Sequence, residues 1–277
     1  MSDRLVARFA DLWRRVRALL ERFVTLVLRH YDYNDQDLTF LIQVHQDFEL
    51  AECAIGRLRK FYLNSRVIVV TDGDSDPRYE TFVHRFNVEL YRQERLFTTC
   101  GCGPMIHRWL ELFFKRPSLW LVRIDTDTRF DRRFRYLPWA IGPQIFGVTQ
   151  TKFRSIQGGC ILFSRAAAQR LYESRILLSP QLHDEFNTWG RYLPREMVAA
   201  RVEKGMAYSD WVLQWAREQV GVSTVEFREI WSTWTQGHKN PDLRYAVVHP
   251  DKSMGLSKKV LADQPGARGE GSHGEEP

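Results

Sequence analysis

The order of apolar and polar positions divides the chain into three parts. Residues 4–30 repeat apolar side chains at alternating spacings of four and three, which predicts one long amphipathic helix. From Leu38 onward, short apolar runs typical of buried strands alternate with segments of helical period. The domains predicted are an N-terminal amphipathic helix in residues 1–34, an α/β domain in residues 35–261, and a tail in residues 262–277. The tail is rich in Gly, Glu and Pro, and we expect it to be disordered.

The strands and helices predicted in the middle part alternate along the chain. The predicted strands are Leu38–Val44, Arg66–Thr71, Val88–Tyr91, Leu119–Ile124, Ile145–Thr149, Gly159–Phe163 and Tyr245–Val248. The predicted helices are Glu49–Leu63, Pro77–Phe86, Pro104–Lys115, Arg165–Ser174, Pro194–Glu203 and Ser209–Gln219. Such alternation predicts right-handed crossovers, so the expected fold class is α/β with a mixed, mainly parallel sheet flanked by helices.

Charge and cysteine content bear on partners and compartment. The net charge is +6, and residues 1–30 contribute seven Arg against three acids. A mildly basic body suits a phosphorylated donor, an anionic acceptor or an acidic membrane surface, and no nucleic-acid motif accompanies the charge. Four cysteines are too few for a disulfide scaffold, and neither a signal peptide nor a membrane span is recognisable. We therefore expect a cytoplasmic protein. Peripheral attachment to the inner face of the membrane is compatible with this expectation.

The N-terminal segment has three candidate partners. An amphipathic helix with an apolar stripe and seven Arg over residues 1–30 is expected to pack on its own domain, to pair with a second copy in a homodimer, or to lie on an anionic membrane surface. The sequence of residues 4–30 leaves these three open.

The sharpest chemical signal is a pair of carboxylates at the end of a predicted strand. Asp125 and Asp127 follow the apolar run Leu119–Ile124 at positions i and i+2. Ligands of open α/β sheets bind at the carboxyl ends of strands, and residues two apart in extended chain face the same side. Both carboxylates can therefore meet one hard divalent cation, which completes its shell with water and substrate phosphate. A pair of turn or capping aspartates is the alternative interpretation.

A second signal lies near the end of the predicted domain. A short apolar strand delivers His249, and Lys252 follows three residues later. Neutral imidazole is a good ligand for Mn²⁺, and a lysine can meet a diphosphate as a point charge. A histidine by itself is more often a surface or core residue, so His249 gains weight only together with the two aspartates.

These segments together resemble the GT-A glycosyltransferases, over roughly Leu38 to Lys252. In that family an Asp-x-Asp after a central strand and a histidine near the C-terminus hold Mn²⁺ or Mg²⁺ on a nucleotide-sugar. The resemblance implies a GT-A-like, Rossmann-like sheet in which Asp125, Asp127 and His249 are the metal ligands, with Mn²⁺ favoured by the imidazole. It also implies a nucleotide-diphospho-sugar donor, with UDP the guess from family frequency, and a glycan or other hydroxyl acceptor.

The same resemblance implies further site residues. His45 lies in a segment similar to the one that cradles the nucleobase and ribose, and Asp72 in one similar to an acidic turn that contacts the base. Gly158 and Gly159 look like the glycine pair that lines the sugar and acceptor pocket. Asp210 is similar to the late acid that supplies the catalytic base in inverting members. That motif usually carries a second acid just before the aspartate, where this chain has Ser.

The residues by themselves leave alternatives at each of these positions. Gly158 and Gly159 allow a ligand or another chain to come close to the backbone, or mark a bulge or bend in an ordinary strand. Asp210 begins a predicted helix, where an acid also caps free N–H groups, and Asp184 or Glu185 could replace it as base. Five tryptophans could contact the acceptor or belong to the core: Trp189, Trp211, Trp215, Trp231 and Trp234. Four arginines could attract phosphates or an anionic acceptor, or form a solvated loop: Arg129, Arg132, Arg133 and Arg135.

The function expected is a metal-dependent glycosyltransferase, with inversion slightly favoured. The alternative is a nucleotide- or carbohydrate-binding protein, or a nucleotidyltransferase of related fold, without sugar transfer. A nucleotidyltransferase usually has a Gly-rich basic loop after its first strand, and the stretch that begins at His45 has no glycine. A phosphatase of the haloacid-dehalogenase type is disfavoured because Arg129 stands where that motif has Thr or Val, and a calcium loop starting at Asp72 because Pro77 replaces the turn glycine.

Overall fold

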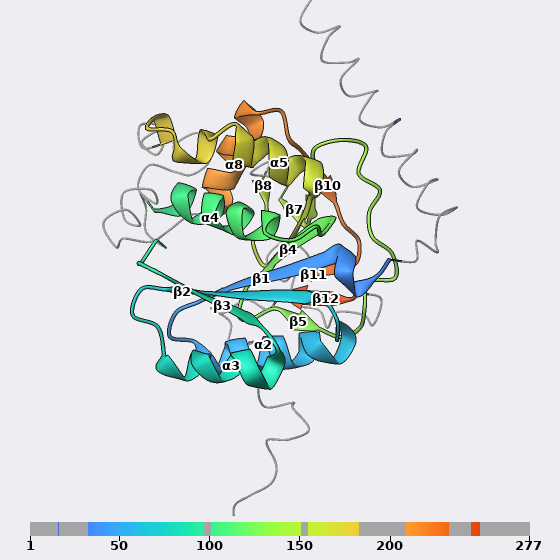
Figure 1. The fold of residues 1–277 in the computed structure, drawn as a ribbon. Helices are drawn as coiled ribbons and strands as arrows, with labels where there is room; N and C mark the ends of the chain where they lie inside the picture. The colour runs from blue at the N-terminus through green and yellow to red at the C-terminus, as the bar shows by residue number, and fades with distance from the viewer. Residues whose placement is uncertain are drawn as a thin grey trace, which may run out of the picture.

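The computed structural model describes residues 33–96, 101–150, 155–182, 209–232 and 245–249, and residue 16. The rest of the predicted N-terminal helix, the helix expected at Pro194–Glu203 and the tail lie outside the described residues, as do Asp184, Glu185 and Lys252. The described part is an α/β structure with a mixed, mainly parallel sheet flanked by helices, as predicted, whereas the GT-A-like identity of the fold stays a prediction (Figure 1). Among the described residues, no helix has the length and apolar content needed to cross a membrane.

A seven-stranded mixed sheet forms the centre of the fold. Its strand order is β10-β6-β9-β4-β1-β2-β3, and β9 alone runs antiparallel to the others. The strands are β1 (Leu38–Val44), β2 (Arg66–Asp72), β3 (Glu89–Gln93), β4 (Trp120–Ile124), β6 (Gln144–Gly147), β9 (Cys160–Ser164) and β10 (Ser223–Glu226). The six parallel strands therefore end at one edge of the sheet, where β4 delivers Asp125.

Helices cover both faces of this sheet (Figure 1). One face carries α2 (Phe48–Phe61) and α3 (Glu80–Phe86), and the other carries α4 (Cys102–Phe114), α5 (Arg165–Glu173) and α8 (Ser209–Gln219). Short 3₁₀ turns, η1 (Asp35–Asp37), η2 (Pro77–Tyr79) and η3 (Ile176–Leu178), complete the connections.

Two apolar cores result from this arrangement, because alternate strand residues point to opposite faces. Phe40 and Ile42 of β1 lie in the core under α2 and α3, whereas Leu41 lies in the core under α4, α5 and α8. All three side chains are fully buried. The near-continuous apolar runs of the parallel strands are thus explained by burial on both faces.

A small second sheet brings the C-terminal part of the described chain to the end of β4. It consists of β5 (Arg129–Phe130), β11 (Ile230–Ser232) and β12 (Val247–His249), in the order β11-β12-β5. β12 pairs antiparallel with β5, so that Val248 lies opposite Arg129. Because only Thr128 separates Asp127 from β5, the pairing of β12 with β5 places His249 beside the two aspartates.

Several element boundaries differ from the sequence prediction for identifiable reasons. The strand predicted at Ile145–Thr149 divides into β6, which pairs with β9, and β7 (Thr149–Gln150), which pairs with β8 (Ser155–Ile156). The helix predicted at Pro77–Phe86 begins as the 3₁₀ turn η2. β5, β8, β10 and β11 were not predicted, because these strands are short and lack an apolar run long enough to be recognised.

Candidate metal centre

A tight turn after β4 fixes the two aspartates. The backbone N–H of Asp125 donates to the carbonyl of Gly159 (3.1 Å) and to Thr128 Oγ1 (3.1 Å), and the hydroxyl of Thr128 donates to the same Gly159 carbonyl (2.5 Å). The N–H of Thr128 in turn donates to the carbonyl of Asp125 (3.1 Å). The turn is therefore tied to the start of β9, which fixes where both carboxylates point.

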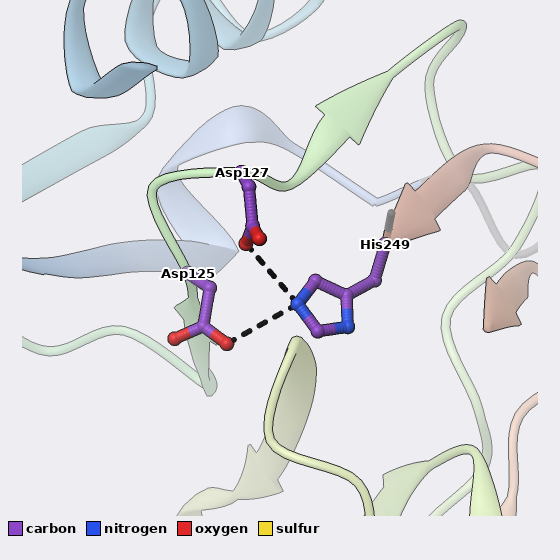
Figure 2. Close-up of side chains that lie close together, drawn as sticks. All are labelled: Asp125, Asp127 and His249. Atoms are coloured by element: carbon purple, nitrogen blue, oxygen red, sulfur yellow. Dashed lines mark hydrogen bonds and ion pairs between the residues drawn. The ribbon is translucent and has the colours of Figure 1, made fainter. Parts of the chain in front are cut away.

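His249 meets both carboxylates at this turn (Figure 2). Its Nε2 lies 3.1 Å from Asp127 Oδ1 and 3.3 Å from Asp125 Oδ2. One donor atom from each of the three residues falls within 4.8 Å of the others. Asp127 and His249 are buried, whereas the side chain of Asp125 keeps 29% of its surface exposed. The cluster is thus open to solvent on the side of Asp125.

The orientation of the imidazole is set by a residue to which the sequence assigned no role. Gln157 is buried, and its side-chain amide lies 3.0 Å from Nδ1 of His249. Nε2 is therefore the ring nitrogen turned towards the carboxylates. Burial by itself would lower the pKa of His249, but the hydrogen bonds and charges of Asp125 and Asp127 outweigh burial and raise the pKa to about 9. The position of Gln157 directly before the glycine pair was the only signal in the sequence.

The two glycines make room for side chains of the chain itself. A Cβ at Gly159 would lie 2.0 Å from Cγ of His249, and a Cβ at Gly158 would lie 2.3 Å from Oδ1 of Asp210. Real Cβ atoms do not approach other atoms so closely, so neither position accommodates a side chain without displacing its neighbour. Side chains of the chain itself therefore approach both glycines, and a contact of either glycine with a ligand stays a prediction.

Asp210 is seated in this turn by a backbone hydrogen bond. The N–H of Gly158 donates to Asp210 Oδ2 (3.0 Å), and Asp210 lies in the first turn of α8. Burial of the carboxyl group raises the pKa of Asp210; Arg123 opposes this effect and the nearby Asp125 adds to it. Asp210 therefore lies next to the metal-ligand candidates, and its carboxyl binds a proton more readily than an ordinary aspartate.

Arg123 is a further charged residue at the centre that sequence reasoning missed. Its Nη2 lies 2.6 Å from Asp125 Oδ1, its Nη1 donates to the carbonyl of Gly158, and its guanidinium lies over the ring of Trp109 at 5.2 Å. The side chain is only 8% exposed. Asp125 thus divides its two oxygens: Oδ1 contacts Arg123 and Oδ2 faces His249. An arginine within an otherwise apolar strand was the available signal.

The residues expected to contact the nucleotide lie at the same edge of the sheet. His45 follows β1, and its Nε2 lies 2.8 Å from Nη1 of Arg95. Asp72 ends β2 and is buried, and it accepts hydrogen bonds from the N–H of Leu96 (2.7 Å) and from Gln93 Nε2 (3.3 Å). Asp72 therefore ties β2 to the segment after β3, and a role towards a base stays a prediction.

The loop after β1 reaches the aspartate turn. The hydroxyl of Thr126, which lies between the two aspartates, donates to Asp47 Oδ2, and Asp47 Oδ1 accepts from the N–H of His45 (3.3 Å). His45 is thus connected to the candidate metal centre through two hydrogen bonds.

The arginine and tryptophan clusters are mostly engaged within the chain. Arg129 pairs with Asp131 (2.9 Å), Arg132 with Glu229 (2.6 Å) and Arg133 with Asp35 (2.6 Å), whereas Arg135 is exposed. Trp211 and Trp215 pack partly buried against the core under α4, and Trp231 lies against Tyr245 with ring centroids 4.9 Å apart. Trp189 and Trp234 lie outside the described residues.

Comparison of the sequence with protein-family models finds no matching family, and comparison with curated proteins finds no significant match. The residues of the centre and their geometry are therefore the basis for any functional assignment.

Proposed function

We propose that the protein is a metal-dependent glycosyltransferase that moves a sugar from a nucleotide diphosphate, with UDP the expected nucleotide, to a hydroxyl acceptor. The observation that carries the proposal is the convergence of Asp125, Asp127 and His249 at the carboxyl edge of the sheet, next to Asp210. Open α/β sheets bind their ligands at this edge.

The donor set fits a divalent cation. Two ligands at right angles around an ion with bonds of about 2.1 Å lie roughly 3 Å apart. The distances from His249 Nε2 to the two carboxylate oxygens are 3.1 and 3.3 Å. Two carboxylate oxygens and one imidazole nitrogen suit Mn²⁺ better than Mg²⁺, because Mg²⁺ prefers oxygen ligands only. A bound cation would neutralise the charge that develops on a leaving nucleotide diphosphate.

The residues of the chain supply the remaining chemistry. Asp210 accepts the proton of the attacking acceptor hydroxyl, because its raised pKa brings the carboxyl closer to the basicity that such a transfer requires. Gly158 holds the Asp210 carboxylate through its N–H, and Arg123 holds both Asp125 and the Gly158 carbonyl. One rigid turn thus positions a metal ligand and the base together. Attack by a hydroxyl that Asp210 deprotonates corresponds to inversion at the anomeric carbon.

A thermal-shift panel of nucleotide-sugars with and without Mn²⁺ tests the proposal. We expect one nucleotide-sugar to raise Tm only when Mn²⁺ is present, because a ligand that binds only the folded state stabilises it. Asp127→Asn removes this shift. Asp37→Asn, which removes an acid at the opposite edge of the sheet, is the matched control and keeps it.

Release of free nucleotide diphosphate and of a glycosylated acceptor separates a transferase from a binding protein. A binding protein would show the metal-dependent shift with no turnover for any donor and acceptor pair. A shift that is unchanged in Asp127→Asn would remove the basis for the proposal altogether.

A further inference from the structure

Most of the exposed large apolar side chains of the described residues lie in segments at the edge of the sheet opposite the candidate metal centre. We use the name amino edge for the segments that precede the six parallel strands: residues 33–37, 62–65, 87–88, 115–119, 131–143 and 220–222. Four of the six exposed large hydrophobic side chains in the described part of the chain lie here. They are Leu63 (70% exposed), Leu119 (44%), Trp139 (62%) and Ile141 (67%).

The exposed charges of the amino edge have one sign. Within these described segments, every exposed charged side chain is basic: Lys115, Arg116 and Arg135. The acids of the same segments are only partly exposed and are engaged. Asp35 pairs with Arg133, Asp37 accepts from the N–H of Asn34, and Asp131 pairs with Arg129. The amino edge therefore combines apolar and cationic groups and presents no fully exposed acid among the described residues.

The carboxyl edge differs in both respects. In the described segments that follow the strands, the exposed side chains are polar or charged and of both signs, as Asp74, Glu94 and Arg95 illustrate. No exposed large hydrophobic residue is found in those described segments. The apolar and basic character is thus a property of one edge and not of the whole surface.

The basic N-terminal segment joins the domain at the amino edge. The hydroxyl of Tyr33 donates to the carbonyl of Phe134 (2.8 Å). The guanidinium of Arg133 lies over the ring of Tyr33, 5.2 Å from its centroid. Residues 1–30, with seven Arg against three acids, therefore connect to this edge. Like charges repel each other, so the net charge of residues 1–30 does not favour their packing on the amino edge. Both are attracted to one shared anionic partner.

We propose that the amino edge docks on a lipid bilayer that contains anionic lipids. Trp139 and Ile141, in a segment bounded by Pro138 and Pro143, enter the interface between headgroups and acyl chains, where tryptophan is favoured. Lys115, Arg116 and Arg135 reach the lipid phosphates. An acidic protein or a nucleic acid would match the charge but would leave the exposed Trp and Ile without an apolar environment.

Docking through the amino edge determines whether the candidate metal centre faces the bilayer or the aqueous phase. Strand β4 separates Leu119 at the amino edge from Asp125 at the carboxyl edge, and its five residues span roughly 17 Å. The centre therefore faces the aqueous side, away from the bilayer. Membrane docking is independent of sugar transfer, so either proposal can fail without the other.

Sedimentation of the full chain with sucrose-loaded vesicles tests the docking. We expect binding to phosphatidylcholine vesicles that contain 30% phosphatidylglycerol to be at least about tenfold stronger than to phosphatidylcholine alone, and to weaken at high salt. Trp139→Ser with Ile141→Ser lowers the partition coefficient by about tenfold or more. Lys115→Gln with Arg116→Gln lowers it by about tenfold on the anionic vesicles only.

Matched controls separate docking from a general loss of charge or of apolar surface. Leu178→Ser changes an exposed apolar residue on η3, and Arg78→Gln with Arg95→Gln removes two exposed charges at the carboxyl edge. Both controls keep the binding of the parent chain. Vesicle binding that survives Trp139→Ser with Ile141→Ser would assign the attachment to residues 4–30 alone and overturn the proposal. A change in the oligomeric state of Trp139→Ser with Ile141→Ser would identify a second copy as the occupant of the amino edge. A fall in the Tm of this variant, when the parent chain does not bind vesicles, would identify residues 4–30 as the occupant. Either outcome would overturn the proposal.

Discussion

Arg123 and Asp125 form a partly buried ion pair in which Nη2 lies 2.6 Å from Oδ1, and this contact decides which oxygen of Asp125 is left for a metal ion. The second oxygen, Oδ2, faces His249 at 3.3 Å. The same arginine donates to the carbonyl of Gly158, whose N–H binds Asp210. One side chain therefore couples the candidate metal ligand to the candidate base.

Replacement of Arg123 by Lys tests this coupling while the positive charge is kept. Lysine offers one point charge in place of the planar fork, so the contacts to Asp125 and to Gly158 are not both maintained. We expect Mn²⁺ affinity to fall by about tenfold or more, as for other residues that orient metal ligands. Isothermal titration with Mn²⁺ measures the change. Arg129→Lys, outside the cluster but also paired with an aspartate, is the control and leaves the affinity within about twofold. Equal affinity in Arg123→Lys and the parent chain would show that Arg123 does not orient Asp125.

Gly159→Ala is expected to displace His249. The new methyl group would lie 2.0 Å from Cγ of the imidazole, so the ring or the turn must shift. Overpacking of this kind costs about 1–3 kcal/mol of the free energy of unfolding. Urea denaturation measures that cost, and we expect the Mn²⁺-dependent thermal shift to disappear because the third candidate ligand has moved. Gly56→Ala is the matched control: its Cβ would meet Phe86 at an ordinary 3.7 Å, and alanine favours the helix by about 1 kcal/mol. A full Mn²⁺ response in Gly159→Ala would contradict the role of His249.

The pKa of His249, raised to about 9, predicts a pH dependence of stability in the metal-free protein. A histidine whose folded pKa exceeds its unfolded value of about 6.5 contributes stability that is fully present below pH 6.5. This contribution, a few kcal/mol in magnitude, is lost as the pH rises from about 6.5 to about 9. Urea unfolding in EDTA at pH 6 and at pH 9.5 measures the loss. His249→Gln flattens the profile over this window, and an identical slope in that variant would assign the effect to another group.

The same proton competes with a metal ion for Nε2 of His249. Nitrogen ligands bind metals in the neutral form, so binding releases the proton that lies between the carboxylates. Mn²⁺ affinity is therefore expected to rise about tenfold per pH unit between pH 7 and pH 9 if one proton is released. Titration at three pH values in buffers of different ionisation enthalpy counts the protons. Affinity that is constant with pH would exclude His249 as a ligand.

Asp210→Asn separates transfer from donor binding. Asparagine retains an oxygen that can accept from the N–H of Gly158, but it cannot take a proton from an acceptor hydroxyl. We expect transfer to fall by about 10²- to 10⁴-fold while the metal-dependent shift with the nucleotide-sugar is kept. Initial rates of nucleotide diphosphate release, together with the thermal-shift assay, measure both properties. Transfer at the parental rate would move the role of base to another residue.

The sequence by itself determined the α/β class and most elements of the main sheet. The runs at Leu38–Val44 and near Trp120–Ile124 were recognisable because strands buried on both faces are almost wholly apolar. It also placed Asp125 and Asp127 at the end of a buried strand and singled out His249 as their partner. Each of these features can be recognised in a short stretch of sequence: an apolar run, the residues that follow one strand, or one short motif.

Only the tertiary structure decided which side chains complete the centre. Gln157 and His249 are 92 positions apart, and the space that Gly159 leaves is filled by that same histidine. Asp210 meets Gly158 across 52 positions, and the pairing of β12 with β5 that delivers His249 depends on strands too short to be recognised. Local patterns of hydrophobicity carry no information about such contacts, because each depends on the relative placement of segments that pack together only in the folded chain.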